Sequence, residues 1–145
     1  MDNLLIRKLK KKDAEEISKI YLNITKSTNI DDFRKIVAKQ AQREEDASFV
    51  AELNGKVVGY LISYTLIGGF GIANSAWVAN IGVNPKFMGQ GIGEKMAGEI
   101  FKYYENKGIK DIYTSVRWDS TDLLSFFKTL GFDRSEFINL KRSLG

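Results

Sequence analysis

Apolar residues recur along the first part of the chain at intervals typical of helices. Asp13, followed three residues later by Glu16, has the spacing of a capping box at a helix start. The apolar residues that follow at helical intervals are Ile17, Ile20, Tyr21 and Ile24. We therefore expect a helix after Asp13, a second helix from Asp31 to about Glu45, and a short strand before both at Leu4–Leu9.

The hydrophobic period changes to two in the middle of the chain. Alternation over Phe49–Leu53 and Lys56–Leu66 predicts two strands. Asn54–Gly55 between them is a strong hairpin signal, because both turn positions favour positive φ. A further strand is expected at Trp77–Val83, just before Pro85, the only proline.

The last third of the chain predicts two more pairs of elements. We expect a helix from Ile92 to a stop at Asn106-Lys107-Gly108, followed by a strand at Ile109–Val116. A helix of about ten residues should follow, capped by Asp119 or Ser120 and ended at Gly131-Phe132. A last strand is expected from about Phe137 to Arg142. The order β-α-α-β-β-β-α-β-α-β predicts one α/β (α+β) domain over residues 1–145 with a partly antiparallel sheet.

Composition narrows the chemistry that this domain can perform. The 145 residues include no cysteine and no histidine, so a Ser-His-Asp triad, a cysteine nucleophile, a disulfide and the usual zinc sites are excluded. No segment approaches the ~20 apolar residues of a membrane span, and the N-terminus lacks the apolar region of a signal peptide. We expect a soluble cytoplasmic protein without a metal.

The charge balance is mildly basic, with 22 Lys and Arg against 18 Asp and Glu. The densest basic cluster is Arg7, Lys8, Lys10, Lys11 and Lys12. It is interpreted as a solvated strand end and loop, the alternative being a phosphate or nucleic-acid patch. A net charge of +4 suits any anionic ligand, and we expect no nucleic-acid partner.

A glycine-rich turn between a strand and a helix is the most informative stretch. It reads Met88, Gly89, Gln90, Gly91, Ile92, Gly93. Glycine permits positive φ and close approach of the backbone to a ligand, while first-turn N–H groups and the helix dipole favour phosphate. We therefore expect a phosphate or pyrophosphate here, the alternative being a tight turn without a ligand. Neither the P-loop pattern nor G-x-G-x-x-G is satisfied.

At this point the sequence resembles the GNAT family of acetyl-CoA-dependent N-acetyltransferases, over nearly the whole chain. The matching segments are Val57–Ile62 for the family's third strand, Ile81–Pro85 for its fourth, Met88–Gly93 for its pyrophosphate loop, and Phe126–Phe132 for its closing F-Y-x-x-L-G-F pattern. Four segments in the family's order and at its spacings are together fairly specific.

The resemblance implies a fold and a donor substrate. The fold is a mixed, mostly antiparallel sheet splayed between its fourth and fifth strands and flanked by about four helices. Acetyl-CoA would bind in this opening, its pantetheine pairing with Ile81, Gly82 and Val83 and its pyrophosphate taking the N–H groups of Met88 to Gly93. A backbone N–H of the fourth strand would polarise the acetyl carbonyl, and a primary amine would attack directly, without a covalent enzyme intermediate. Dimers are common among relatives, so a homodimer is possible.

Departures from the family pattern concern the proton-transfer groups. Phe127 stands where relatives usually place the tyrosine that protonates the leaving thiolate, so water or Ser120 would donate instead. The resemblance places Ser120 and Phe127 beside the pantetheine. The expected fourth strand carries no acid, which leaves Asn80 through a water, Glu52 or Asp119 as general base. Asn80 and Ser120 are the predicted catalytic residues.

Two groups of side chains could extend the site. The aromatic residues Trp77, Trp118, Tyr60, Tyr64 and Phe70 are interpreted as core packing or as the lining of an acceptor pocket, with Phe70 the strongest pocket candidate. Lys86, Lys95 and Lys128 could reach the 3′-phosphate of CoA, or be ordinary surface lysines. The function predicted is an N-acetyltransferase, the alternative being a catalytically idle acyl-CoA-binding or regulatory domain.

Overall fold

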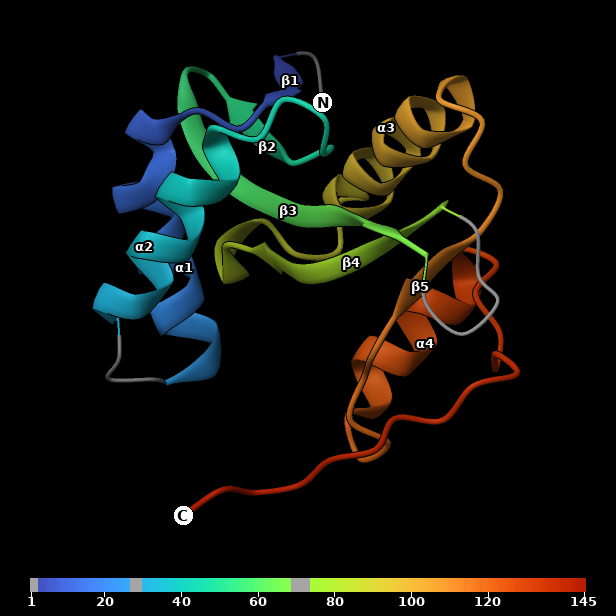
Figure 1. Cartoon of the computed structure of the whole chain (residues 1–145). Helices are drawn as coiled ribbons and strands as arrows, with labels where there is room; N and C mark the ends of the chain where they lie inside the picture. Colours follow the sequence, from blue (N-terminus) through green and yellow to red (C-terminus); the bar gives the residue numbers. More distant parts are fainter. Residues whose placement is uncertain (1–2, 27–29, 69–73) are drawn as a thin grey trace.

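Alternating apolar side chains and the turn at Asn54–Gly55 produce a continuous antiparallel run of strands. A computed structural model describes residues 3–26, 30–68 and 74–145. In it, β1 (Leu4–Lys8), β2 (Phe49–Leu53), β3 (Lys56–Ile67) and β4 (Asn74–Val83) pair antiparallel in that order, and β5 (Ile112–Thr114) joins β4 in parallel (Figure 1). Asn54 and Gly55 have φ of 52° and 81°, which confirms the predicted hairpin turn.

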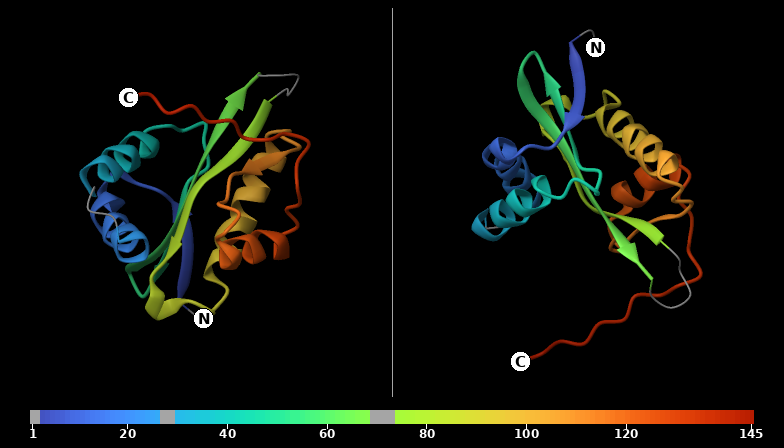
Figure 2. Two further views of the ribbon diagram at one scale, coloured as in Figure 1. Left: turned by 90° about the horizontal axis from the view of Figure 1, so that it is seen from below. Right: turned by 45° about the horizontal axis from the view of Figure 1, so that its top comes forward.

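The helices cover the two faces of this sheet. α1 (Ala14–Thr25) and α2 (Ile30–Ala41) lie on one face, and α3 (Ile92–Asn106) and α4 (Thr121–Thr129) on the other (Figure 2). Each face has its own core. Buried members of the core under α1 and α2 include Ile17, Val37, Val50 and Tyr60, and those of the core under α3 and α4 include Leu61, Met96, Ile100 and Phe127. The mixed, mostly antiparallel sheet and its helices confirm the predicted fold class.

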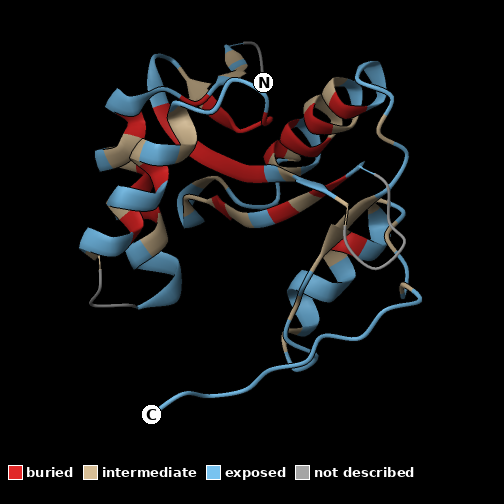
Figure 3. Ribbon diagram, viewed as in Figure 1, coloured by how far each residue is buried: buried red, intermediate tan, exposed pale blue. Residues whose placement is uncertain are grey.

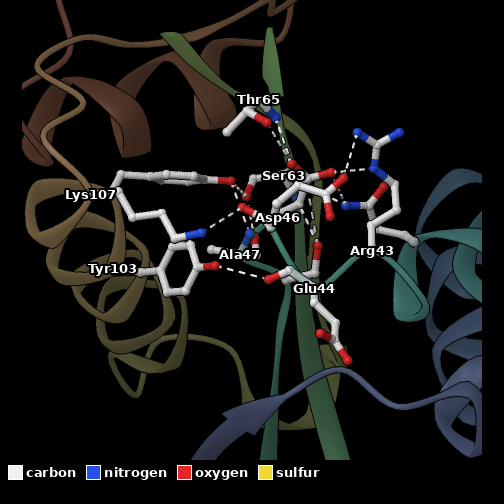
Figure 4. A network of polar contacts seen from close by, with 12 residues as sticks. Arg43, Glu44, Asp46, Ala47, Ser63, Thr65, Tyr103 and Lys107 are labelled. Carbon is white, nitrogen blue, oxygen red and sulfur yellow. Dashed lines mark hydrogen bonds and ion pairs between the residues drawn. The ribbon is translucent and has the colours of Figure 1, made fainter. Parts of the chain in front are cut away.

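A buried polar network ties the segment between α2 and β2 to the rest of the fold (Figure 4). Asp46 accepts hydrogen bonds from the N–H and Oγ1 of Thr65, both at 2.9 Å, and pairs with Arg43 at 2.6 Å. Ser63 bonds the Ala47 carbonyl and contacts the Tyr104 hydroxyl at 2.6 Å. The network satisfies polar groups that would be costly to bury alone and joins β3 to α3.

Asp13 behaves differently from the prediction. It precedes α1, but its side chain does not cap that helix. Its carboxylate binds Arg7 through both oxygens at 2.8 Å and accepts the Lys10 N–H at 2.8 Å. The predicted capping box with Glu16 is therefore wrong, because the strand-borne guanidinium of Arg7 is the stronger partner. Arg7 also binds Glu52, so it turns inward and does not belong to a free basic patch.

The C-terminal part of the chain departs most from the predicted elements. The strand predicted at Phe137–Arg142 is absent, and the segment runs extended and largely exposed (Figure 3). The sequence alternates as a strand does, but the segment makes no ladder with any described strand. The strand predicted at Ile109–Val116 is likewise shortened to β5, and its pairing with β4 ends at Val78 and Thr114.

The predicted ends of α3 and α4 are confirmed. Gly108 has φ of 77° just beyond α3, and its N–H donates to the Glu105 carbonyl at 3.0 Å. Gly131 has φ of 95° beyond α4. None of the helices in the described residues has both the length and the apolar character needed to cross a membrane.

Candidate functional site

β4 and β5 separate at the middle of β4, which opens the sheet. The two strands pair at Ala76–Ile112, Trp77–Tyr113 and Val78–Thr114, and the Thr114 hydroxyl donates to the Val78 carbonyl at 2.9 Å. Toward β3, Asn80 pairs with Ile62 and Val78 with Ser63, so Ala79 is an extra residue in β4. A bulge thus coincides with the point of separation. From Ala79 to Val83, β4 has no neighbour on the β5 side among the described strands.

The turn after β4 owes its shape to two glycines in left-handed conformation. Gly89 and Gly91 have φ of 79° and 78°, and a Cβ on either would meet no atom within 4 Å. Glycine is therefore required there by backbone conformation and not by lack of space. Gly91 occupies the N-cap position of α3, whose first-turn N–H groups have no intrahelical acceptor. These donors point out of the end of the helix.

Gly93 serves a different purpose. A Cβ there would lie 3.1 Å from two ring atoms of Phe126 on α4. Its absence lets α4 pack closely against the start of α3. Gly82 is tighter still, because a Cβ would lie 2.6 Å from the ring of Tyr60, its cross-strand partner. Glycine at these two positions is required by close approach of aromatic rings.

A cavity of about 760 Å³ collects most of the predicted binding residues. The predicted residues that line it are Ile81, Gly82, Val83, Met88, Gly89, Gly91, Ile92, Gly93 and Ser120. Phe87 after β4, Leu123 and Phe126 of α4, and Ile24 of α1 complete the apolar part of the lining. Gln90, Asn80 and Phe127 are not among the residues that line it. The open half of β4, the turn and the two helix N-termini therefore face one space.

The charge of this cavity is unusual for a phosphate site. Its lining includes the carboxylates of Glu94, Asp119 and Asp122, and no lysine or arginine among the described residues. The Arg117 guanidinium binds both Asp119 oxygens, at 3.0 and 2.9 Å, and this hydrogen bonding lowers the pKa of Asp119. An anion in this space would depend on backbone N–H groups.

The lysines considered for the 3′-phosphate lie outside that lining. Lys86 and Lys95 are exposed near the turn, whereas Lys128 lines a different cavity. No group of three or more Asp or Glu side chains in the described part of the chain is arranged to hold a metal ion.

Ser120 lies at the N-terminal end of α4, as predicted, but its hydroxyl makes no capping bond. Its φ and ψ of −89° and 76° differ from the extended conformation of a capping serine. The backbone bonds of the residue are made, since its N–H donates to the Arg117 carbonyl and its carbonyl accepts from Leu124. The hydroxyl remains available to a ligand in the cavity.

Asn80 is held by Tyr60, which was interpreted from the sequence as core packing or as the lining of an acceptor pocket. The Tyr60 hydroxyl donates to Asn80 Oδ1 at 3.1 Å. Burial raises the pKa of Tyr60 far above its usual value, so the phenol stays protonated and keeps donating. The edge of Phe33 packs against Tyr60, and Tyr21 stacks on Phe33 with ring centroids 3.9 Å apart. The bulge region is thus anchored to α1 and α2.

Phe126 and Phe127 line different cavities. Phe127 is buried in the core and packs on Phe132 with centroids 5.1 Å apart. It lines a larger cavity of about 1010 Å³ on the β5 side of α4. Phe126, one residue earlier, lines the cavity of the glycine-rich turn. Its ring packs against Gly93. Gly93 and Phe126 both belong to segments that match the family pattern, but that pattern did not indicate that they touch.

Other predicted candidates lie apart from the turn. Glu52 on β2 forms an ion pair with Arg7 on β1 and does not line the cavity. Trp77 stacks on Tyr113 at 4.9 Å, whereas Trp118 is exposed. Tyr64 is partly exposed at the end of β3. Phe70 lies outside the described residues.

Comparisons with known proteins identify relatives of this chain. The sequence model of the acetyltransferase (GNAT) family matches residues 14–132. An uncharacterized N-acetyltransferase of Methanocaldococcus jannaschii is 31% identical over 98 residues, which make up 67% of this chain and 43% of that protein. The chain therefore spans less than half the length of this curated relative.

Solved structures share the fold over its whole extent. An aminoglycoside N-acetyltransferase in complex with CoA superposes with a TM-score of 0.82 at 19% identity, covering 97% of this chain and 94% of that one. A ribosomal-protein-alanine N-acetyltransferase from Brucella melitensis biovar Abortus 2308 gives 0.79 at 15% identity, covering 98% and 99%. At these identities the likeness establishes the common fold.

Proposed function

The chain belongs to the GNAT family of acetyltransferases, and we propose that it transfers the acetyl group of acetyl-CoA directly to a primary amine. The observation that carries the proposal is the cavity beside the turn at Gly89 and Gly91. The unpaired half of β4, the free N–H groups of α3 and the start of α4 all border it. An extended thioester that carries a pyrophosphate has complementary groups for each of these three features.

In this proposal, the backbone holds the donor. The pantetheine amides pair with Ile81–Val83 as an additional strand would, and Ser120 contacts the pantetheine from α4. The pyrophosphate oxygens accept hydrogen bonds from the N–H groups of Met88–Gly93. Because Glu94, Asp119 and Asp122 border the same space, the 3′-phosphate is directed toward the exposed side of the turn, where Lys86 and Lys95 lie.

The chemical step proposed needs no covalent intermediate. The amine nitrogen attacks the acetyl carbon, the new C–N bond forms, and the C–S bond then breaks to release CoA thiolate. A backbone N–H at the β4 bulge stabilises the carbonyl oxygen as negative charge develops. The amine loses its proton through a water held by Asn80, and the thiolate receives a proton from water or Ser120.

A second candidate function is acyl-CoA binding without turnover. It is favoured by Phe127, which has no proton to donate and is buried in the core. β4 also carries no carboxylate. Both functions predict the same donor site, so they differ only in whether an amine accelerates release of CoA thiol.

The test measures binding and turnover separately. Calorimetry with acetyl-CoA should give a measurable Kd for the wild-type chain and none for Gly91→Glu, whose side chain would enter the cavity. Gly108→Glu is the matched control, because Gly108 has nearly the same positive φ and open surroundings at the other end of α3. Loss of binding in both variants, or in neither, would contradict the donor placement.

Turnover is measured as release of CoA thiol with a panel of amines. An amine that accelerates release supports the transferase. Binding of acetyl-CoA without any acceleration supports the idle domain. We further propose a cytoplasmic location, where acetyl-CoA is available, and association of two copies.

A further inference from the structure

Acidic side chains line the cavity of the glycine-rich turn, although the donor proposed to bind there is an anion. They are Glu94 on α3 and Asp119 and Asp122 at the start of α4. Carboxylates of this kind are ionised at neutral pH. Asp119 is compensated by the bidentate bond from Arg117, whereas Glu94 and Asp122 form no ion pair with any described residue. Two uncompensated negative charges therefore border the space that would hold the donor.

The lysines near the turn lie outside this cavity. Lys86 lies just before the turn and is exposed. Lys95 follows Glu94 on α3, where one residue along the helix rotates the side chain by about 100°, and it does not belong to the lining. Lysine and arginine are also absent from the three segments outside the described residues, which are 1–2, 27–29 and 69–73. The cavity therefore offers an anion no basic side chain.

The groups that can hold a pyrophosphate are backbone N–H groups of a single helical turn. Gly91 is the N-cap of α3, and its carbonyl accepts the N–H of Lys95 at 3.1 Å. The N–H groups of Ile92, Gly93 and Glu94, which come before that bond, have no intrahelical acceptor. These donors lie close together, so they suit one compact anion. A second anion farther along the same ligand would need other partners.

The 3′-phosphate of CoA is such a second anion, attached to the ribose beyond the pyrophosphate. A phosphate monoester carries a charge of about −1.5 to −2 at pH 7. In the donor placement proposed above, it is directed toward the exposed side of the turn, where Lys86 and Lys95 lie. An exposed ion pair with a lysine is weak, because water and salt screen it and the side chain must be ordered. Repulsion by Glu94 and Asp122 opposes even this small gain.

We propose that the site recognises acetyl-CoA through its pantetheine and pyrophosphate, and that Glu94 and Asp122 cancel any affinity from the 3′-phosphate. The donor class is then wider than acetyl-CoA. It includes acetyl-dephospho-CoA, which has a hydroxyl in place of the 3′-phosphate and carries the same reactive thioester. The inference rests on the proposed function, whose donor placement it uses, but it concerns binding and does not require turnover.

Calorimetry at about 0.1 M salt compares the two donors on the wild-type chain. We expect the Kd values of acetyl-CoA and acetyl-dephospho-CoA to agree within about threefold. A basic side chain dedicated to the 3′-phosphate would make acetyl-CoA bind at least about tenfold more tightly, and that result would overturn the inference. Binding of neither donor would instead contradict the donor site of the proposed function, so the two failures are distinguishable.

Removal of the two uncompensated charges tests the cause. In the double variant Glu94→Gln with Asp122→Asn, acetyl-CoA should gain about threefold or more in affinity relative to acetyl-dephospho-CoA at about 0.02 M salt, and the gain should vanish at about 0.5 M. The ratio of the two Kd values cancels any effect on the shared pantetheine and pyrophosphate.

The matched control for net charge is Asp133→Asn with Glu136→Gln, because both residues are exposed and line the other cavity. It should keep the wild-type ratio of Kd values. A ratio that responds equally in both double variants, or in neither, would overturn the role given to Glu94 and Asp122.

The double variant Lys86→Gln with Lys95→Gln tests the remaining cations. The two Kd values should still agree within about threefold, since exposed lysines contribute little to an anion in water. A loss of about tenfold in the affinity for acetyl-CoA that spares acetyl-dephospho-CoA would show that these lysines bind the 3′-phosphate. That result would overturn the inference while leaving the donor site in place.

Discussion

Tyr60 on β3 donates a hydrogen bond to Asn80 on β4, with 3.1 Å between Tyr60 Oη and Asn80 Oδ1, one residue from the bulge that opens the sheet. The tyrosine is buried and the asparagine borders the opening. The buried partner therefore orients the amide, which in our proposal holds the water that takes the proton of the amine.

Tyr60→Phe tests whether this orientation matters for turnover. We expect kcat to fall about tenfold while the KM for acetyl-CoA stays within about twofold, because the change affects a positioned amide and not the donor site. Stability should fall by about 1 kcal/mol. Tyr104→Phe also removes a buried hydroxyl, but away from the cavity, and should lower stability without lowering kcat. Equal loss of kcat in both variants would argue against a positioning role. The assay is release of CoA thiol.

Gly82→Ala tests the close approach of Tyr60 to β4. The new methyl group would lie 2.6 Å from the Tyr60 ring, which is 1% exposed. We expect unfolding in urea to show a loss of about 2 kcal/mol. Gly98→Ala is the matched control, because it lies in α3 with nothing within 4 Å of its Cβ position and should gain about 0.5–1 kcal/mol. A neutral Gly82→Ala would contradict the packing.

Phe127→Tyr restores the residue common in the family, and we expect it to leave kcat unchanged. The ring is buried beside Phe132 and lines the cavity next to β5 and not that of the glycine-rich turn, so we expect the added hydroxyl to lose hydration without reaching the reacting atoms, at a cost of about 1–3 kcal/mol of stability. Phe126→Tyr, whose ring lines the cavity of the glycine-rich turn, should lose less stability. A large gain in kcat for Phe127→Tyr, without loss of stability, would show that this ring reaches the reacting atoms.

Asp13 makes stability depend on acid pH. Burial by itself would raise its pKa, but hydrogen bonds from Arg7 and the Lys10 N–H outweigh burial, and the pKa lies below its usual value. A carboxyl with a lowered folded-state pKa stabilises the fold above its unfolded pKa of about 3.9, and this contribution is lost as pH falls through the folded-state pKa. Asp13→Asn should lose about 2 kcal/mol at pH 7 and show a flatter decline in Tm below pH 4.

The exposed Asp133→Asn serves as control for this measurement and should follow the wild type over the whole range. Parallel acid limbs for Asp13→Asn and the wild type would show that the pair with Arg7 does not contribute to the pH dependence.

The sequence determined the local features of this protein. Asn54–Gly55 specified a hairpin because few other dipeptides accept positive φ at both positions. The glycine-rich turn at Met88–Gly93 was placed correctly at the start of α3 for the same reason. The order of elements could be predicted because periodicity and turn chemistry are properties of neighbouring residues. The four segments that match the family then identified the fold.

Only the tertiary structure decided which groups meet across the sheet and which segments find partners. Asp13 binds Arg7 and does not cap α1, because the stronger partner lies on another strand. Phe126 and not Phe127 faces the turn, since one residue along α4 rotates a side chain by about 100°. Residues 137–142 alternate as a strand but form none, because a strand depends on hydrogen bonds to a neighbour that its own sequence does not supply.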